Sequence, residues 1–108
     1  MEKVIQQFID AINAFDIDAA LELFTDDAVI DDESVGESFK NTAGVRKYLD
    51  KFFVGYKTVT KLESIEVLDN WHIKAQVDFI GDFGHETGGL NFTFNTNGFI
   101  NAINAYLD

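Results

Sequence analysis

The segment Asp26-Asp27-Ala28-Val29-Ile30-Asp31-Asp32 sets three apolar residues between two pairs of acidic ones. Successive side chains of a β-strand point to opposite faces of the sheet. A register that buries Ala28 and Ile30 therefore also buries Asp32 and leaves Val29 and Asp31 outside. The segment predicts a strand that carries one carboxylate to the mouth of an apolar interior.

A carboxylate in that position suits proton-transfer chemistry. A carboxyl group that loses hydration has a raised pKa, which brings it closer to useful acid-base catalysis at neutral pH. Acidic pairs also gather at strand ends simply because water solvates them there. The residues alone leave both interpretations of Asp32 open.

Length and composition indicate a single domain over residues 1–108. A chain of this length buries roughly two thirds of the surface that it exposes when unfolded, and 46% of its residues are hydrophobic. Eleven residues are Phe, which favours a curved sheet around a bulky core or a cavity. The lack of Cys excludes disulfides, thiolate metal sites and a cysteine nucleophile.

The charge of the chain narrows the expected partners. Eight Lys and Arg stand against 19 Asp and Glu, and the formal net charge of −11 argues against nucleic acids and membrane surfaces. The sequence shows no leader-like segment and no apolar run long enough to span a bilayer. We therefore expect a cytoplasmic protein.

Apolar residues recur at helical spacing in three places. They predict helices over residues 3–14, 17–24 and 42–53, and the apolar face of the first is expected to run from Val4 to Phe15. Asp16 is expected to cap the second helix, and Asn41-Thr42 the third. A polar loop is expected at residues 33–40.

Beyond Gly55 the pattern alternates and predicts four strands, at residues 58–68, 71–80, 90–95 and 99–107. The short turns between them make these strands antiparallel neighbours. The expected fold is α+β, with three N-terminal helices, and one strand among them, packed on a curved antiparallel sheet.

This order of elements resembles the cone-shaped, cystatin-like fold of the nuclear transport factor 2-like and SnoaL-like superfamily, to which polyketide cyclases and ketosteroid isomerase belong. The stretch from Phe8 to Asp32 is similar to the first half of a ketosteroid isomerase without a gap. Thr42-Ala43-Gly44-Val45-Arg46 resembles the start of that family's third helix, and Phe92-Thr93-Phe94-Asn95 with Gly98 its fourth strand and last turn.

The resemblance implies a catalytic role for Asp32, which matches the aspartate that moves the proton in ketosteroid isomerase. The other functional residues of that enzyme are absent. Its oxyanion-binding tyrosine matches Phe8, its two supporting tyrosines match Phe24 and Leu49, and its protonated aspartic acid matches Leu90. Losing one oxyanion donor costs about 3 kcal/mol of transition-state stabilisation, so steroid isomerisation by that route is not expected.

A ligand pocket is expected around Asp32. Asn101 either faces Asp32 with its amide or bonds to a neighbouring loop, and His85 and Glu86 lie in a glycine-rich turn that suits either a functional loop or an exposed hairpin end. The tyrosines Tyr48, Tyr56 and Tyr106 are further candidate donors. The predicted pocket residues are Phe8, Phe24, Leu49, Phe53, Val77, Phe79, Leu90, Phe92, Asn101 and Ile103.

Neither a metal site nor a cofactor is expected. The loop from Asp31 to Gly36 resembles a calcium loop, but Val35 stands where an oxygen ligand is required and Thr42 where the closing Glu belongs. The two His residues lie apart and there is no Cys, which makes a zinc site improbable.

Two functions are therefore expected as alternatives. The first is a cofactor-independent isomerase, cyclase or hydratase in which Asp32 transfers a proton on a small hydrophobic carbonyl compound. The second is a non-catalytic binding module for a small hydrophobic ligand. In either case two copies are expected to pair as a homodimer through the outer sheet face, where Lys74, Gln76, Asp78 and Ile80 alternate with buried residues.

Overall fold

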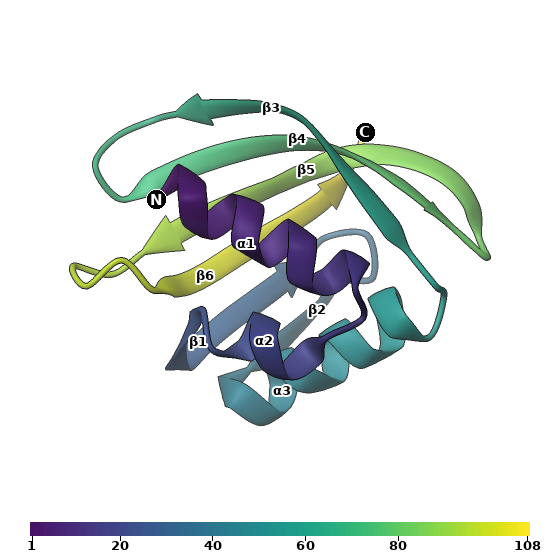
Figure 1. The fold of residues 1–108 in the computed structure, drawn as a ribbon, viewed down its shortest axis with the longest axis horizontal. Coiled ribbons are helices and arrows are strands. Elements are labelled where there is room, and N and C mark those ends of the chain that lie inside the picture. The colour runs from purple at the N-terminus through teal and green to yellow at the C-terminus, as the bar shows by residue number, and fades with distance from the viewer.

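The structure is a computed structural model that describes residues 1–108. Two helices and two strands come first, a third helix with a π-helical turn follows, and four strands complete the chain (Figure 1). The elements are α1 (Glu2–Asn13), α2 (Ile17–Leu21), β1 (Phe24–Asp32), β2 (Glu37–Lys40), α3 (Asn41–Leu49), η1 (Asp50–Val54), β3 (Val59–Val67), β4 (His72–Gly81), β5 (Gly84–Phe94) and β6 (Ile100–Leu107).

All six strands form one sheet in the order β2-β1-β6-β5-β4-β3. Strands β3 to β6 make the predicted antiparallel meander. β1 lies parallel to β6, with Ile30 opposite Ile103 and Asp32 opposite Ala105. This parallel pair extends the predicted antiparallel meander and was not predicted, because an alternating pattern gives the faces of a strand but neither its neighbour nor the direction of that neighbour.

Residues 33–40 do not form one loop. Residues 37–40 are β2, which pairs antiparallel with β1, and Ser38 Oγ donates a hydrogen bond to Asp31 across the pair. The turn before β2 ends at Gly36, whose φ of +66° is a conformation that favours glycine. A four-residue polar strand is too short to show alternation, so the sequence pattern missed it.

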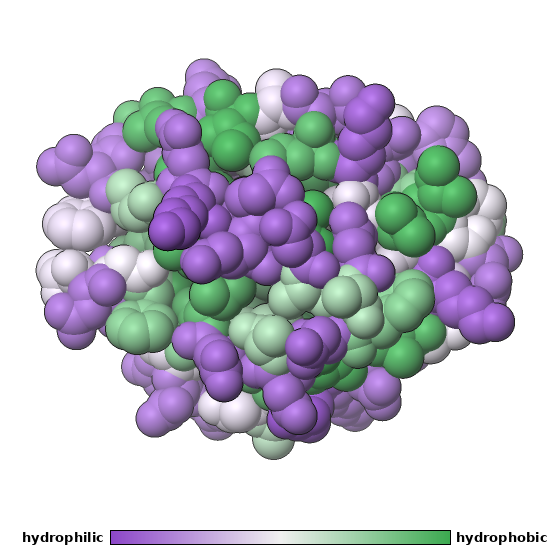
Figure 2. Space-filling model, viewed as in Figure 1, coloured by the Kyte–Doolittle hydropathy of each residue, from purple (hydrophilic) through white to green (hydrophobic).

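The helices lie on one face of the sheet (Figure 1). α1 contacts β3, and α3 contacts β1 and β2. The residues of α1 at positions i, i+3, i+4 and i+7 are buried, namely Ile5, Phe8, Ile9 and Ile12. Its outward side is hydrophilic (Figure 2). No helix is long and apolar enough to cross a membrane.

The connection between α1 and α2 departs from the prediction at Phe15. This residue has a φ of +56° and is 41% exposed, because the chain leaves the helix here and the apolar face ends at Ile12. Asp16 caps α2 as predicted, with its carboxylate accepting from the amide of Ala19 at 3.1 Å. α2 is shorter than expected, and Phe24 begins β1 instead of ending the helix.

The third helix also starts and ends differently from the prediction. Neither Asn41 nor Thr42 caps it, and Asn41 has a φ of +65°. Its α-helical part ends at Leu49, and the chain continues through the π-helical turn η1 to Val54. Such turns insert an extra residue into a helix and are frequent at functional sites.

The core lies between the helices and the sheet. Phe8 of α1 is its centre, with ring centroids 5.7 Å from both Phe24 and Phe92 in edge-to-face arrangements. In β4 the alternate residues Ile73, Ala75, Val77 and Phe79 are buried, as the outward assignment of Lys74, Gln76 and Asp78 requires. Aromatic pairs of this geometry add to the free energy gained by burial.

Phe8→Ala is expected to lower the free energy of unfolding by about 3–5 kcal/mol, because it leaves a cavity between two other rings. Urea unfolding followed by circular dichroism measures the change. Phe99→Ala is the control, since Phe99 is 44% exposed and its truncation should cost about 0.5 kcal/mol or less. Equal losses in the two variants would contradict this assignment of the core.

Candidate functional site

Asp32 is the last residue of β1 and is only 7% exposed. Ala28 and Ile30 are buried with it and Asp31 is exposed, so the alternation predicted from the sequence is confirmed. The neighbouring β6 fixes this end of the strand, where the amide of Glu33 donates to the carbonyl of Ala105 at 2.9 Å. The carboxylate is thus held by regular sheet structure and not by a loop alone.

Three donors surround the carboxylate of Asp32. The amide and the hydroxyl of Ser34 donate to Oδ1 at 2.9 and 2.6 Å, and the hydroxyl of Tyr48 donates to Oδ2 at 2.6 Å. The Ser34 bonds close a turn of the kind that Asp side chains commonly make with the backbone two residues on. Short bonds to a charged acceptor stabilise the ionised form and oppose the desolvation cost of burial.

Tyr48 reaches Asp32 from α3. Its side chain is buried among rings, with centroids 5.0 Å from Phe39 and 5.0 Å from Phe52. Burial raises the pKa of Tyr48 far above its usual range, and the hydrogen bond to Asp32 and the charge of Asp32 raise the pKa further. The phenol therefore stays protonated and acts as a permanent donor to the carboxylate.

A cavity of about 240 Å³ lies against this group. Strands β1, β4, β5 and β6, the third helix and its π-helical turn all contribute to its wall. Most of the wall is apolar, and the remaining groups are hydroxyls and two carboxylates. The lining residues are Asp32, Ser34, Tyr48, Phe52, Phe53, Tyr56, Thr58, Phe79, Phe83, Glu86 and Leu107.

The π-helical turn explains the aromatic wall. Tyr48, Phe52 and Tyr56 are four residues apart and would share one face of a regular helix. The extra residue of η1 lets two successive side chains point to that same face, so that Phe53 lines the cavity together with Phe52. A regular helix would turn one of these two rings away.

The β4–β5 hairpin forms the mouth of the cavity. Phe83 at its tip has its ring 6.0 Å from that of Tyr56, and the amide of Asp82 donates to the carbonyl of Tyr56 at 2.8 Å. A Cβ at Gly81 would lie 2.8 Å from both the Phe83 ring and the Tyr56 carbonyl. Glycine is required there because the hairpin and the end of the helix approach so closely.

The structure brings together only part of the predicted pocket. Phe53 and Phe79 line the cavity beside Asp32. Asn101 lies near the beginning of β1, where its amide donates to Thr25 Oγ1 at 3.3 Å, and does not face Asp32. The other predicted lining residues belong to the buried core and do not line the cavity: Phe8, Phe24, Leu49, Val77, Leu90, Phe92 and Ile103.

Several lining residues are not among the predicted pocket residues. Tyr48 and Tyr56 are candidate donors in the sequence, with no spacing that singles one out, and Glu86 is a candidate of the glycine-rich turn. The regular interval of Tyr48, Phe52 and Tyr56 was the available signal, and it is equally typical of a core-facing helix. Ser34 and Phe83 lie in turns, where no pattern predicts the direction of a side chain.

Histidine does not take part in this site. His85 contacts Asp78 across the β4–β5 hairpin and is absent from the cavity wall. No group of three or more His, Asp or Glu side chains is placed to hold a metal ion. The polar side chains on the cavity wall carry carboxylates and hydroxyls.

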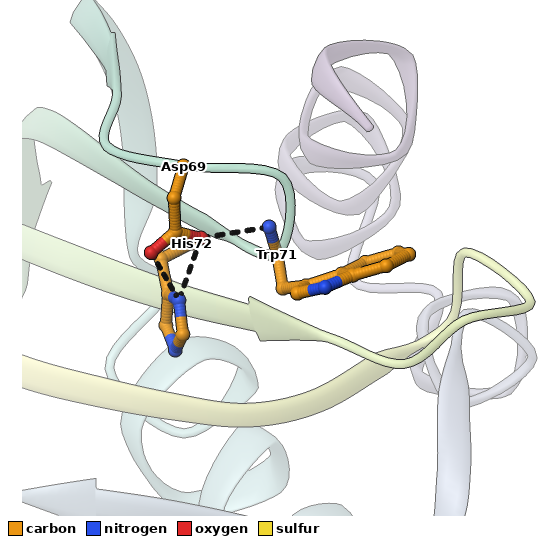
Figure 3. A network of polar contacts seen from close by, with 3 residues as sticks. All are labelled: Asp69, Trp71 and His72. Carbon is orange, nitrogen blue, oxygen red and sulfur yellow. Dashed lines mark hydrogen bonds and ion pairs between the residues drawn. The ribbon is translucent and has the colours of Figure 1, made fainter.

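A second polar cluster lies at the β3–β4 turn (Figure 3). The carboxylate of Asp69 accepts from the Trp71 amide at 2.8 Å and contacts His72 Nδ1 at 2.8 and 3.0 Å. The hydrogen bond from the Trp71 amide lowers the pKa of Asp69, and the hydrogen bond with the His72 side chain lowers it further. The Trp71 ring points away from the pair (Figure 3). These contacts fix the turn and do not reach the cavity around Asp32.

The raised pKa of Tyr48 predicts a loss of stability in alkali. Its stabilising effect is complete below the unfolded pKa of about 10 and disappears as the pH rises above that value, because only the unfolded chain then releases the proton. Urea unfolding between pH 8 and pH 11 should show this decline, and Tyr48→Phe should reduce it. In absorbance titration, one of the three tyrosines should ionise only on unfolding; three early ionisations would contradict the assignment.

Comparisons with known proteins agree with this architecture. The chain is similar to the solved structure of SalBIII, an epoxide hydrolase/cyclase-like enzyme with a role in pyran ring formation in the polyether salinomycin. The two share 17% sequence identity, the match covers 99% of this chain and 89% of that one, and the TM-score is 0.88. A Mycobacterium tuberculosis protein, RV0760c, solved in complex with estradiol-17β-hemisuccinate, has 20% identity, coverage of 97% and 91%, and a TM-score of 0.84.

An NTF2-like protein of unknown function from Cytophaga hutchinsonii is similar over 99% of this chain and 88% of its own, with 12% identity and a TM-score of 0.83. Similarity to solved structures at such low sequence identity shows the fold alone. The family is shown by the sequence match, in which the SnoaL-like domain covers residues 5–98. The chain therefore belongs to the SnoaL-like domain family and has the NTF2-like fold that its sequence resembles.

Proposed function

We propose that the chain binds a small hydrophobic compound in the cavity and that Asp32 accepts a proton from it, as in a cofactor-independent isomerase, cyclase or hydratase. The observation that carries the proposal is a single buried carboxylate held by three donors on the wall of an apolar cavity. A carboxylate fixed in this way needs no reorganisation when it meets a bound proton donor.

The geometry also bears on the kind of proton that Asp32 would take. The donors of Ser34 and Tyr48 point at Asp32, and the hydroxyl of Thr58 donates to the carbonyl of Phe52 at 2.7 Å. None of these three groups is free to stabilise a developing enolate, which leaves the hydroxyl of Tyr56 near the mouth as the one unpartnered side-chain donor of the wall. The geometry therefore favours a substrate whose own hydroxyl, or an attacking water, gives up the proton over the predicted carbonyl compound.

A base in an apolar cavity is testable without the natural substrate. The ring opening of 5-nitrobenzisoxazole needs only removal of one C–H proton, and it produces a coloured phenolate. We expect the protein to accelerate this reaction, and Asp32→Asn to reduce the rate about 100-fold, as is typical for loss of a general base. Asp31→Asn is the matched control, because Asp31 is adjacent but exposed and should keep the full rate.

The alternative function, a binding module, is favoured by the aromatic wall of the cavity. Fluorescence titration with the neutral dye N-phenyl-1-naphthylamine tests binding separately from catalysis. Dye binding without any Asp32-dependent ring opening would reject the catalytic proposal and support the binding module. If the dye does not bind and the spectra of residues around the cavity do not change, both the catalytic proposal and the binding module are rejected.

We also propose that two copies pair through the outer face of the sheet. Lys74, Gln76 and Asp78 lie on that face, and the apolar side chain of Ile80 beside them is 58% exposed. The helices cover the opposite face of the sheet (Figure 1). Sedimentation at micromolar concentration should give the mass of a dimer, and a monomer would reject the pairing.

A further inference from the structure

We propose that the cavity selects organic cations, and that its preferred occupant is an ammonium group carried on an apolar body. The inference rests on the proposed function, since it concerns the ligand of the same cavity. It follows from three properties of the wall: the charges that face the cavity, the use of its hydrogen-bond donors, and its aromatic rings.

The wall of the cavity carries two carboxylates and no basic side chain. Asp32 lies in the buried part of the cavity and Glu86 at its exposed mouth, while no Lys, Arg or His lines it. The ion pairs of the chain lie elsewhere and leave both carboxylates without a basic partner. An anionic ligand would meet two like charges and no counter-charge, whereas a cation would meet two opposite charges.

In the buried part of the cavity, the hydrogen-bonding positions that remain free are acceptors. A carboxylate offers about four acceptor positions, and three on Asp32 are taken by Ser34 and Tyr48. The hydroxyl of Thr58 already donates to Phe52. The hydroxyl of Tyr56, near the mouth, is the one side-chain donor of the wall without a partner. A ligand that supplies its own donors or positive charge therefore satisfies this wall, and a ligand that needs donors does not.

The aromatic rings favour a cation over a neutral donor. Six aromatic side chains line the cavity, and four of them form a continuous row of tilted and edge-to-face neighbours. The negative faces of such rings attract an ammonium group, most strongly where water is excluded. The row along the helix and hairpin comprises Tyr48, Phe52, Tyr56 and Phe83, with neighbouring centroids 5.0, 6.1 and 6.0 Å apart. The ammonium of Lys51 already lies over the Phe52 ring, 5.2 Å from its centroid, so the other rings carry this argument.

A matched pair of probes separates charge from shape. Benzyltrimethylammonium is a permanent cation, and neopentylbenzene is its uncharged carbon isostere. Competition against N-phenyl-1-naphthylamine gives the affinity of each, and 3-phenylpropanoate serves as the anion. We expect the cation to bind about tenfold more tightly than the isostere, in line with cation–π and charge contributions of this size, and the anion to bind most weakly.

Glu86→Gln tests the origin of the selectivity. Glu86 is exposed, so the variant should fold, and it should weaken binding of the cation about threefold to tenfold while leaving the isostere unchanged. Glu66→Gln removes the same charge from β3, away from the cavity wall, and should change neither affinity. This control separates a local effect from that of net charge.

The outcomes distinguish the inference from the proposed function. Tighter binding of the cation together with a loss specific to Glu86→Gln supports cation selectivity. Dye binding with equal affinities for cation and isostere, or equal effects of Glu86→Gln and Glu66→Gln, overturns the selectivity and leaves the cavity as a binding site. Failure of the dye and of every probe to bind overturns the proposed function itself.

Discussion

The parallel pairing of β1 with β6 is the contact on which the rest of the structure depends. It joins a strand that ends at residue 32 to one that begins at residue 100. The pairing continues the meander to β2 and places the end of β1 under the third helix, within reach of Tyr48. Such a distant contact closes a long loop, and its formation must offset the entropy lost in that closure. The cavity depends on the same contact, because Leu107 of β6 forms part of its wall.

The environment of Asp32 is a balance between burial and hydrogen bonding. Removing a carboxylate from water is costly, and the cost is usually met by pairing with a cation or by neutralisation. Here the compensation comes from two neutral side chains and one amide. This arrangement keeps a negative charge at the wall of an apolar cavity without adding a positive one. It also commits the nearby donors to Asp32, which leaves acceptors and aromatic rings on most of the cavity wall.

The sequence predicted those features that depend on local periodicity. Each of these features is determined by a few consecutive residues. They are the buried face of β1, the amphipathic α1, the Asp16 cap and the meander. The parallel pairing, β2 and the π-helical turn depend on tertiary contacts, so no local pattern contained them. The same limit applies to the site. Asp32 lies on a patterned strand, whereas a long Phe side chain such as Phe8 or Phe92 fills the core as readily as it lines a cavity.

The π-helical turn bears on how the wall of the cavity can change. A π turn holds one residue more than an α-helical turn over nearly the same rotation about the helix axis. A single-residue deletion between residues 50 and 54 would therefore restore regular α-helical geometry with little rotation of the residues beyond it. One of the two rings Phe52 and Phe53 would leave the cavity wall, while Tyr48 and Asp32, which precede the turn, and Tyr56, which follows it, would keep their places. Insertion or deletion of one residue at this turn thus offers evolution a means of reshaping the aromatic wall without displacing Asp32.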